Sequence, residues 1–140
     1  LATSLASVTF ASPSNLTSIG QEAFQSTAIS SITIPASVVS VGDYAFFQIS
    51  SLSRAIFLGN APATIGTEVF NFASSGATAI IKPTATGFGD TGDSWNLLTV
   101  TKVGGGYNCL TEGSTTGAGT FTVTDFIVTT SETQGFCLNE

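Results

Sequence analysis

Acidic side chains are the residues of this chain best suited to chemistry, and they are few. Among 140 residues there are nine Asp or Glu, three Lys or Arg, and no His. The commonest general base and nitrogen metal ligand is therefore absent. A glycosidase needs two carboxylates in one cleft, but Glu22, Asp43 and Glu68 follow successive glycines of a repeated motif, so we expect them along one solvated outer edge. We predict no catalytic site, no enzyme activity and no cofactor.

A Gly-rich segment, Gly89–Asp93, contains the one arrangement of acids that hints at a metal. Asp90 and Asp93, together with loop carbonyls, would offer the oxygen ligands that calcium prefers. The segment has fewer ligands than an EF-hand loop, so the favoured interpretation is an ordinary loop ahead of Trp95. We expect no metal here.

Cys109 and Cys137 are the only two cysteines, and both lie near the C-terminal end. In an oxidising compartment they would close a loop of about 29 residues and stabilise it by roughly 3–4 kcal/mol on the chain-entropy model. Two free buried thiols, or bonds to other chains, are the alternatives. We favour the intrachain disulfide.

The composition describes a polar but mostly uncharged surface. Charged residues are only 9% of the chain, and 18 Ser and 22 Thr take their place. Such a surface suits an extracellular or cell-surface setting and offers hydroxyls for glycans, although the strand propensity of Thr explains it equally well. Asn15-Leu16-Thr17 also fits an N-glycosylation sequon.

Charge and hydropathy exclude two classes of partner. The net charge is −6, whereas phosphate binding needs clusters of Lys and Arg, so we expect no nucleic acid. There is no run of about 18 apolar residues, so we expect no membrane insertion within this chain. Because the chain begins at Leu1 rather than Met, we expect it to be a piece of a longer product.

A six-residue motif occurs three times, at Ile19–Phe24, Val41–Phe46 and Ile65–Phe70. Each copy has an aliphatic residue, a glycine, two variable residues, a small residue and a phenylalanine. The copies lie 22 and 24 residues apart, a period typical of stacked-repeat solenoids. We expect each glycine where a side chain would clash or φ is positive. The predicted core residues are Ile19, Val41, Ile65, Phe24, Phe46 and Phe70.

A second pattern precedes each copy and predicts a short strand. Three apolar residues are spaced as apolar-x-x-apolar-x-apolar, starting at Leu5, Ile29 and Leu52, with a weaker fourth copy starting at Ala77. The last two apolar positions are two residues apart, so both point to one face of the strand. Because no coil can bury its own apolar edge, neighbouring coils must stack.

The two patterns together resemble the BspA-type leucine-rich repeat family of bacterial and protist surface proteins. Leu16–Phe24 and Ile32–Phe46 carry the resemblance, which extends over about residues 4–99. It implies a mainly β, right-handed leucine-rich-repeat solenoid of about four short coils with one short parallel strand each. It also implies a role in adhesion or surface recognition. Residues 57–97 look like the closing coil of such an array.

We therefore divide the chain into two parts. Residues 1–99 form the solenoid with its closing coil, and residues 100–140 form a Gly/Thr-rich C-terminal β segment that the disulfide would close. Within the second part, the alternation over residues 120–130 predicts a single strand, apolar on both faces near its end. Forty residues make a poor independent core, so we expect this segment to pack on the solenoid or on another chain.

The strand face turned away from the core is the expected recognition surface. Its predicted register gives one row of Ser7, Ser31, Arg54 and Ala79 and a second row of Thr9, Thr33, Ile56 and Ile81. The candidate binding residues are Ser31, Thr33, Arg54, Ile56, Ala79 and Ile81. The favoured alternative is that the C-terminal segment or a neighbouring chain covers Ile56 and Ile81.

Two functions are compatible with these features, and both have protein partners or copies of the chain itself. The preferred function is a non-catalytic extracellular or cell-surface module for adhesion or protein recognition. The alternative is a structural subunit that self-assembles into a filament or surface layer, because the solenoid starts without a charged or helical cap and the low charge weakens repulsion. A sugar-binding domain is disfavoured, since Tyr44 and Trp95 are the only plausible stacking aromatics and Trp95 is expected to plug the last coil.

Overall fold

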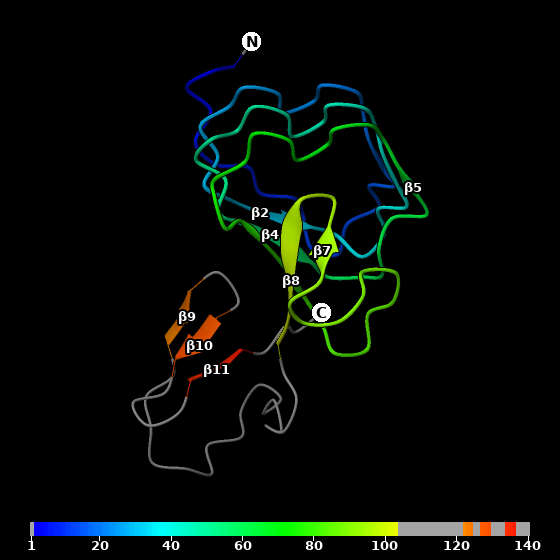
Figure 1. The fold of residues 1–140 in the computed structure, drawn as a ribbon, viewed down its shortest axis with the longest axis vertical. Helices are drawn as coiled ribbons and strands as arrows, with labels where there is room; N and C mark the ends of the chain where they lie inside the picture. The colour runs from blue at the N-terminus through cyan, green and yellow to red at the C-terminus, as the bar shows by residue number, and fades with distance from the viewer. Residues whose placement is uncertain (1, 104–121, 125–126, 130–133, 137–140) are drawn as a thin grey trace.

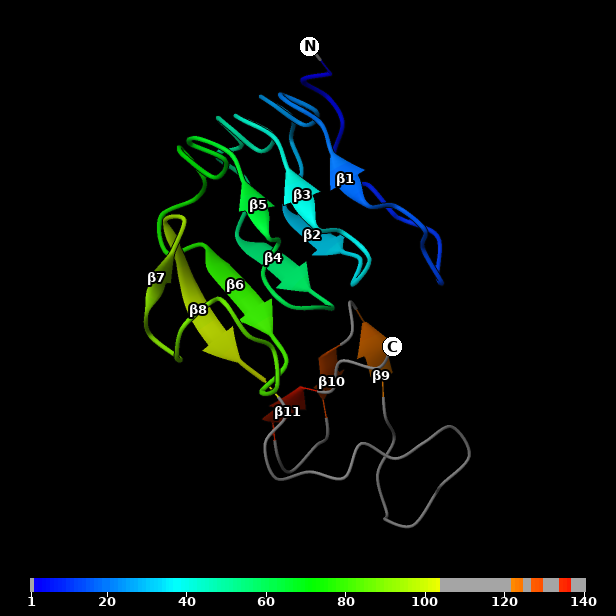
Figure 2. The same cartoon turned by 90° about the vertical axis from the view of Figure 1, so that its right-hand side faces the viewer.

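The structure, a computed structural model, describes residues 2–103, 122–124, 127–129 and 134–136 (Figure 1). Within these ranges it consists of short strands and turns, with no helix. The first 103 residues wind into stacked coils, which Figure 2 shows side by side. The smaller parallel sheet contains β1 (Ser18–Ile19), β3 (Ser40–Val41) and β5 (Thr64–Ile65). The larger sheet contains β2 (Ser31–Ile34), β4 (Arg54–Phe57), β6 (Thr78–Ile81) and β8 (Leu98–Lys102) in parallel, with β7 (Ser94–Trp95) antiparallel to β8.

This arrangement confirms the predicted mainly β solenoid of about four coils. It differs from the prediction in the number of strands. Each of the coils that carry the Gly–Phe motif has a strand of the smaller sheet directly before the motif glycine, so a coil can contain two short parallel strands instead of one. β8 also extends to Lys102, so the last coil passes the expected boundary at residue 99.

The first coil departs from the predicted pattern. Residues 5–11 form no strand, and among the described residues β2 has a strand partner only on the side of β4. Val8 and Phe10 are nevertheless half-buried and pack against the core. The apolar spacing therefore directs the side chains inward even where the backbone does not form a ladder.

Three phenylalanines, one from each motif, stack along the solenoid axis. The ring centroids of Phe24 and Phe46 are 5.2 Å apart with an interplanar angle of 16°. Those of Phe46 and Phe70 are also 5.2 Å apart, at 3°. Phe46 is fully buried and Phe70 nearly so, whereas Phe24 is only half-buried because it lies in the first coil. Ile65, predicted as core, is likewise half-buried.

Trp95 closes the other end of this stack, as the sequence predicted. Its ring lies 4.8 Å from Phe88, 5.2 Å from Phe57 and 6.2 Å from Phe70, measured between centroids. Trp95 belongs to β7, which pairs antiparallel with β8. The reversed strand and the indole ring together cover the apolar surface that a further coil would otherwise bury.

The repeated glycines are required by close backbone contact between coils. A Cβ at Gly66 would lie 2.4 Å from the nitrogen of Asp43, and one at Gly42 would lie 2.6 Å from the nitrogen of Gln21. Neither glycine has a positive φ. At Gly20 a Cβ would meet nothing within 4 Å, because no described coil lies against it on that side. Of the two roles expected for these glycines, steric clearance is therefore the one observed.

The fourth coil has a register that the sequence pattern missed. Ala55 lies three residues after Leu52, but its ladder partner Ala79 lies only two residues after Ala77. Leu52 and Ala77 both follow the same kind of turn, donating to the carbonyls three residues before them. A shift of one residue reverses which side chains face the core. Ala79 and Ile81 are therefore fully buried in the core rather than on the outward face, and Thr78 and Ile80 take their places.

The C-terminal segment contains a small antiparallel sheet, in the order β11-β10-β9. Its strands are β9 (Thr122–Thr124), β10 (Ile127–Thr129) and β11 (Gln134–Phe136). The single strand predicted over residues 120–130 is wrong, because Thr124 pairs with Ile127 and the chain reverses between them.

Replacement of Phe46 tests the stacked core. We expect Phe46→Ala to lower the free energy of unfolding by about 3–5 kcal/mol, because it removes a fully buried ring and leaves a cavity between two coils. Thr33→Ala, on the outward face of β2, is the control and should cost less than about 0.5 kcal/mol. Urea midpoints measure both. Equal losses would contradict the assignment of inward and outward faces.

Substitution of the repeat glycines tests the clearance between coils. Gly66→Ala should destabilise the protein by about 1–3 kcal/mol, because its Cβ would overlap backbone atoms of the preceding coil. Gly20→Ala changes the same motif position in the first coil and should stay within about 0.5 kcal/mol of the parent. Thermal unfolding followed by circular dichroism compares the two, and a Gly20 variant as damaged as the Gly66 variant would be inconsistent with this role.

Candidate functional site

The outward face of the larger sheet carries two rows of side chains. The ladder register places Ser31, Arg54, Thr78 and Thr99 in the first row and Thr33, Ile56, Ile80 and Thr101 in the second. Both rows begin and end with hydroxyl residues. Between them, the first row contains Arg54 and the second contains Ile56 and Ile80. Of the six predicted binding residues, Ser31, Thr33, Arg54 and Ile56 lie on this face, and Ala79 and Ile81 do not.

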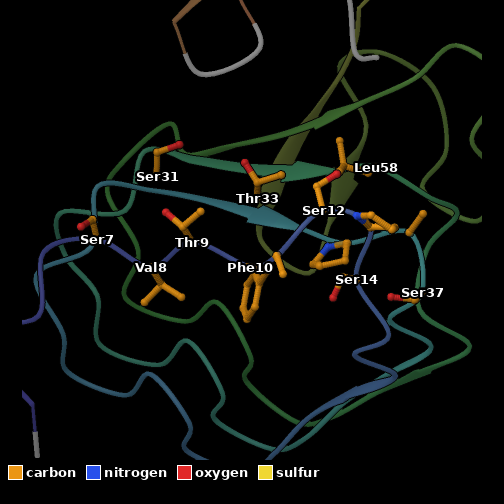
Figure 3. A pocket seen from close by; sticks show the side chains of 14 residues that line it. Ser7, Val8, Thr9, Phe10, Ser12, Ser14, Ser31, Thr33, Ser37 and Leu58 are labelled. Atoms are coloured by element: carbon orange, nitrogen blue, oxygen red, sulfur yellow. The ribbon is translucent and has the colours of Figure 1, made fainter. Parts of the chain in front are cut away.

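A hollow of about 760 Å³ lies over the first two coils of this face. Figure 3 shows Ser7 and Thr9 from the first coil beside Ser31 and Thr33 of β2, with Val8 and Phe10 pointing to the opposite side. The alternation follows from the two-residue period of an extended chain. The described residues that line the hollow include seven Ser or Thr and no charged residue: Ser7, Val8, Thr9, Phe10, Ala11, Ser12, Pro13, Ser14, Ser31, Thr33, Pro35, Ala36, Ser37 and Leu58.

The middle of the second row is apolar and buried, whereas Thr99 is exposed and Thr101 is partly exposed at the end of the face. Ile56, Ile80 and Val103 form a cluster with Leu58 packed against it, and Ile56 is only 1% exposed. Figures 1 and 2 both place β9–β11 on the side of the larger sheet that faces away from the solenoid core. Coverage was expected for Ile56. The second covered isoleucine is Ile80, and not Ile81 as the incorrect register implied.

The acidic loop before β7 makes internal bonds that use its carboxylates. The Nζ of Lys102 donates to Oδ1 of Asp90 at 2.5 Å, and the backbone N–H of Asp90 donates to Oδ2 of Asp93 at 2.8 Å. The hydrogen bond and charge of Lys102 lower the pKa of Asp90 below its usual value. This exposed pair therefore stabilises the folded state at pH values above the ordinary pKa of an aspartate. The stabilisation is lost as the pH falls through the lowered pKa of Asp90. An ammonium group against Asp90 argues against the calcium candidate.

The carboxylates that follow the repeat glycines also have structural roles. Asp43 Oδ1 accepts a hydrogen bond of 2.7 Å from the backbone N–H of Thr67 in the next coil. Glu68 Oε2 accepts one of 3.3 Å from the side-chain amide of Asn71. Glu22, Asp43 and Glu68 are exposed, as an outer edge requires.

The remaining predictions concern metal binding, the disulfide and membrane insertion. In the part of the chain that the structure describes, no group of three or more acids, cysteines or histidines is arranged to hold a metal. Cys109 and Cys137 lie outside the described residues, so the disulfide stays a prediction. Among the described residues, no helix is long and apolar enough to cross a lipid bilayer.

Sequence reasoning missed a group of aromatic side chains on the turn edge. This edge consists of the stacked turns that follow the motif glycines, at residues 21–26, 43–48 and 67–72. Phe72 is 61% exposed, and its ring lies next to Phe47, which in turn contacts Tyr44. Alignment of the repeats could have revealed this group. Phe72 occupies the position that Ser26 and Gln48 hold in the preceding coils, so an apolar ring replaces polar side chains there.

The comparison with protein families agrees with the repeat geometry. Six copies of the BspA type leucine rich repeat region match residues 2–91. This chain belongs to the BspA-type leucine-rich repeat family. No curated protein and no solved structure matches the sequence significantly. Leucine-rich repeat modules generally mediate protein–protein interactions, and proteins with BspA-type repeats are typically secreted or located at the cell surface.

Addition of calcium tests the interpretation of the acidic loop. We expect millimolar calcium to leave the thermal midpoint of the protein unchanged relative to EDTA, because Asp90 and Asp93 already accept bonds from Lys102 and the loop backbone. A cation that binds the folded state would raise the midpoint, by an amount that grows with the logarithm of its affinity. A rise that Asp93→Asn abolishes would establish a calcium site.

Proposed function

We propose that this domain is a non-catalytic extracellular module that binds a protein partner through the hydroxyl-lined hollow over its first two coils. The observation that carries the proposal is the hollow itself. It has a volume of about 760 Å³ and lies on the outward strand face. The core side chains of the coils that form it point away from it. Protein recognition is the general role of leucine-rich repeat modules.

The chemistry of the lining favours an uncharged polar partner surface. Serine and threonine hydroxyls both donate and accept hydrogen bonds, so they can pair with backbone amides or with polar side chains. The described lining contains no charged side chain to steer a charged ligand. Extracellular adhesion is supported by the family and by the low charge of the whole chain.

The absence of catalysis is part of the same proposal. The chain contains no histidine. Two of the carboxylates on the turn edge accept structural hydrogen bonds. In the later loop, the Asp93 carboxylate accepts a bond from the backbone N–H of Asp90, and the Asp90 carboxylate accepts one from Lys102. None of these groups lines the hollow.

Obstruction of the hollow tests this function. Thr33→Arg would place a long charged side chain in the hollow, whereas Thr64→Arg changes an exposed threonine of β5 in the other sheet. We expect the parent domain and Thr64→Arg to bind immobilised collagen, fibronectin or laminin in a saturable manner, and Thr33→Arg to lose that binding with an unchanged thermal midpoint. Equal binding by Thr33→Arg would contradict the role of the hollow.

One observation favours the alternative of a self-assembling structural subunit. The first coil retains the motif glycine, although nothing lies within 4 Å of a Cβ there. In the next two coils the same glycine admits a neighbouring backbone. The free side of the first coil thus has the clearance that a further coil, from this chain or from another copy, would use.

Solution assembly distinguishes the alternative from the preferred function. A self-assembling subunit should form filaments or sheets at micromolar concentration, seen by negative-stain microscopy and size-exclusion chromatography. Gly20→Val should block them, because its side chain occupies the space between stacked coils, while leaving the single domain folded. A monodisperse monomer of the parent protein would contradict assembly through this end.

A further inference from the structure

We propose that the turn edge of the second and third coils is a second binding surface, which accepts an arginine or lysine side chain of a protein partner. The surface, called the aromatic edge below, consists of Tyr44, Phe47 and Phe72. None of these residues lines the hollow on the outward strand face. The proposal therefore stands independently of the function assigned to that hollow.

The three rings are arranged edge to face. The centroids of Tyr44 and Phe47 are 5.3 Å apart with an interplanar angle of 85°, and those of Phe47 and Phe72 are 5.4 Å apart at 87°. This geometry aligns the positive edge of one ring with the negative face of the next and fixes the rings against each other. Phe72 is 61% exposed, and the other two are partly exposed. The result is an ordered aromatic surface open to solvent.

The backbone at Phe72 is held in a conformation that its side chain disfavours. Its φ is +62°, and the equivalent residues Ser26 and Gln48 have φ values of +56° and +57°. In those coils the position suits polar residues, and Ser26 Oγ donates to Gln48 Oε1 at 3.2 Å. A bulky residue is uncommon in the left-handed region. Burial does not compensate for this strain, because most of the ring is exposed. A strained and exposed aromatic residue indicates a role in binding.

Carboxylates flank Tyr44, at one end of the aromatic edge, and favour a cationic ligand. The backbone N–H of Glu22 donates to the carbonyl of Asp43 at 2.9 Å, and that of Tyr44 donates to the carbonyl of Thr67 at 3.0 Å. These bonds place Glu22, Tyr44 and Glu68 at the same position of three successive coils. Paired strands are about 4.8 Å apart, so carboxylates from both neighbouring coils flank the tyrosine. Asp43 adds a third exposed acid.

An aromatic surface with flanking carboxylates is complementary to a cation. A guanidinium or ammonium group is attracted to the face of an aromatic ring and also pairs with carboxylates. Arginine fits best, because its planar guanidinium group can stack on a ring and at the same time form bidentate hydrogen bonds with a carboxylate. The three basic residues of this chain lie elsewhere: Arg54 in β4, Lys82 after β6 and Lys102 in β8. A basic side chain must therefore come from a partner.

Titration with a basic peptide tests the proposal. The probe is an acetylated and amidated peptide of alternating glycine and arginine with three arginines, and the readout is the NMR shift of the ring protons of Tyr44, Phe47 and Phe72. We expect saturable shifts that weaken as salt rises, because exposed ion pairs are screened. Phe72→Ser should raise Kd about two- to fivefold. Its thermal midpoint should not fall, because serine occurs at the equivalent position and tolerates the backbone there.

Three controls make the outcome decisive. Val39→Ser removes another exposed apolar side chain, at 54% exposure, and should leave Kd unchanged. Thr33→Arg, which obstructs the hollow, should also leave it unchanged. The same peptide with glutamine in place of arginine should cause no saturable shift. Unaltered binding by Phe72→Ser, or equal shifts with the glutamine peptide or with a neutral oligosaccharide such as maltotriose, would overturn the proposal.

Discussion

Every other feature of this fold depends on the stacking of one coil on the next. A single coil of about two dozen residues has an apolar interior that it cannot enclose, so its stability comes from its neighbours. Phe46 shows this most directly. Its ring lies between Phe24 and Phe70 at 5.2 Å from each, and it is fully buried only because a coil lies on either side. The equivalent Phe24 in the first coil, with one such neighbour, stays half-buried.

The same contact between coils imposes strict requirements on the backbone. The motif glycines at 42 and 66 leave room for the preceding coil, and hydrogen bonds from alternate residues of the turn edge, such as Phe24 and Phe46, join each coil to the following one. Asp43 adds a side-chain bond to Thr67 in the next coil. At the far end the periodicity stops, and Trp95 together with the antiparallel β7 covers the last apolar layer. These contacts set the register in which successive coils present their surfaces.

Two surfaces of different chemistry result from this register. The outward face of the first two coils is concave and carries hydroxyls without charge, whereas the turn edge carries aromatic rings beside carboxylates. The small number of charged residues makes their positions informative. Within residues 2–103, all five acids lie on the turn edge or in the loop before β7, and Lys102 pairs with Asp90 in that loop. The two proposals together would place an uncharged polar partner surface and a basic partner side chain at separate sites.

The repeating unit can be predicted from the sequence alone, because the period of the motif directly reflects the stacking of coils. The sequence identified the stacked phenylalanines, the glycines and the closing role of Trp95. It also identified the hydroxyl residues Ser31 and Thr33 on the outward strand face. The register of the fourth coil becomes visible only in the folded protein, where one residue fewer after Ala77 places Ala79 and Ile81 in the core. A pattern with a period of two residues cannot reveal such a shift, since either face of an apolar strand fits it. The aromatic edge likewise depends on which residues become neighbours across coils, and that is set by backbone hydrogen bonds between Tyr44 and Thr67 and between Gln48 and Asn71.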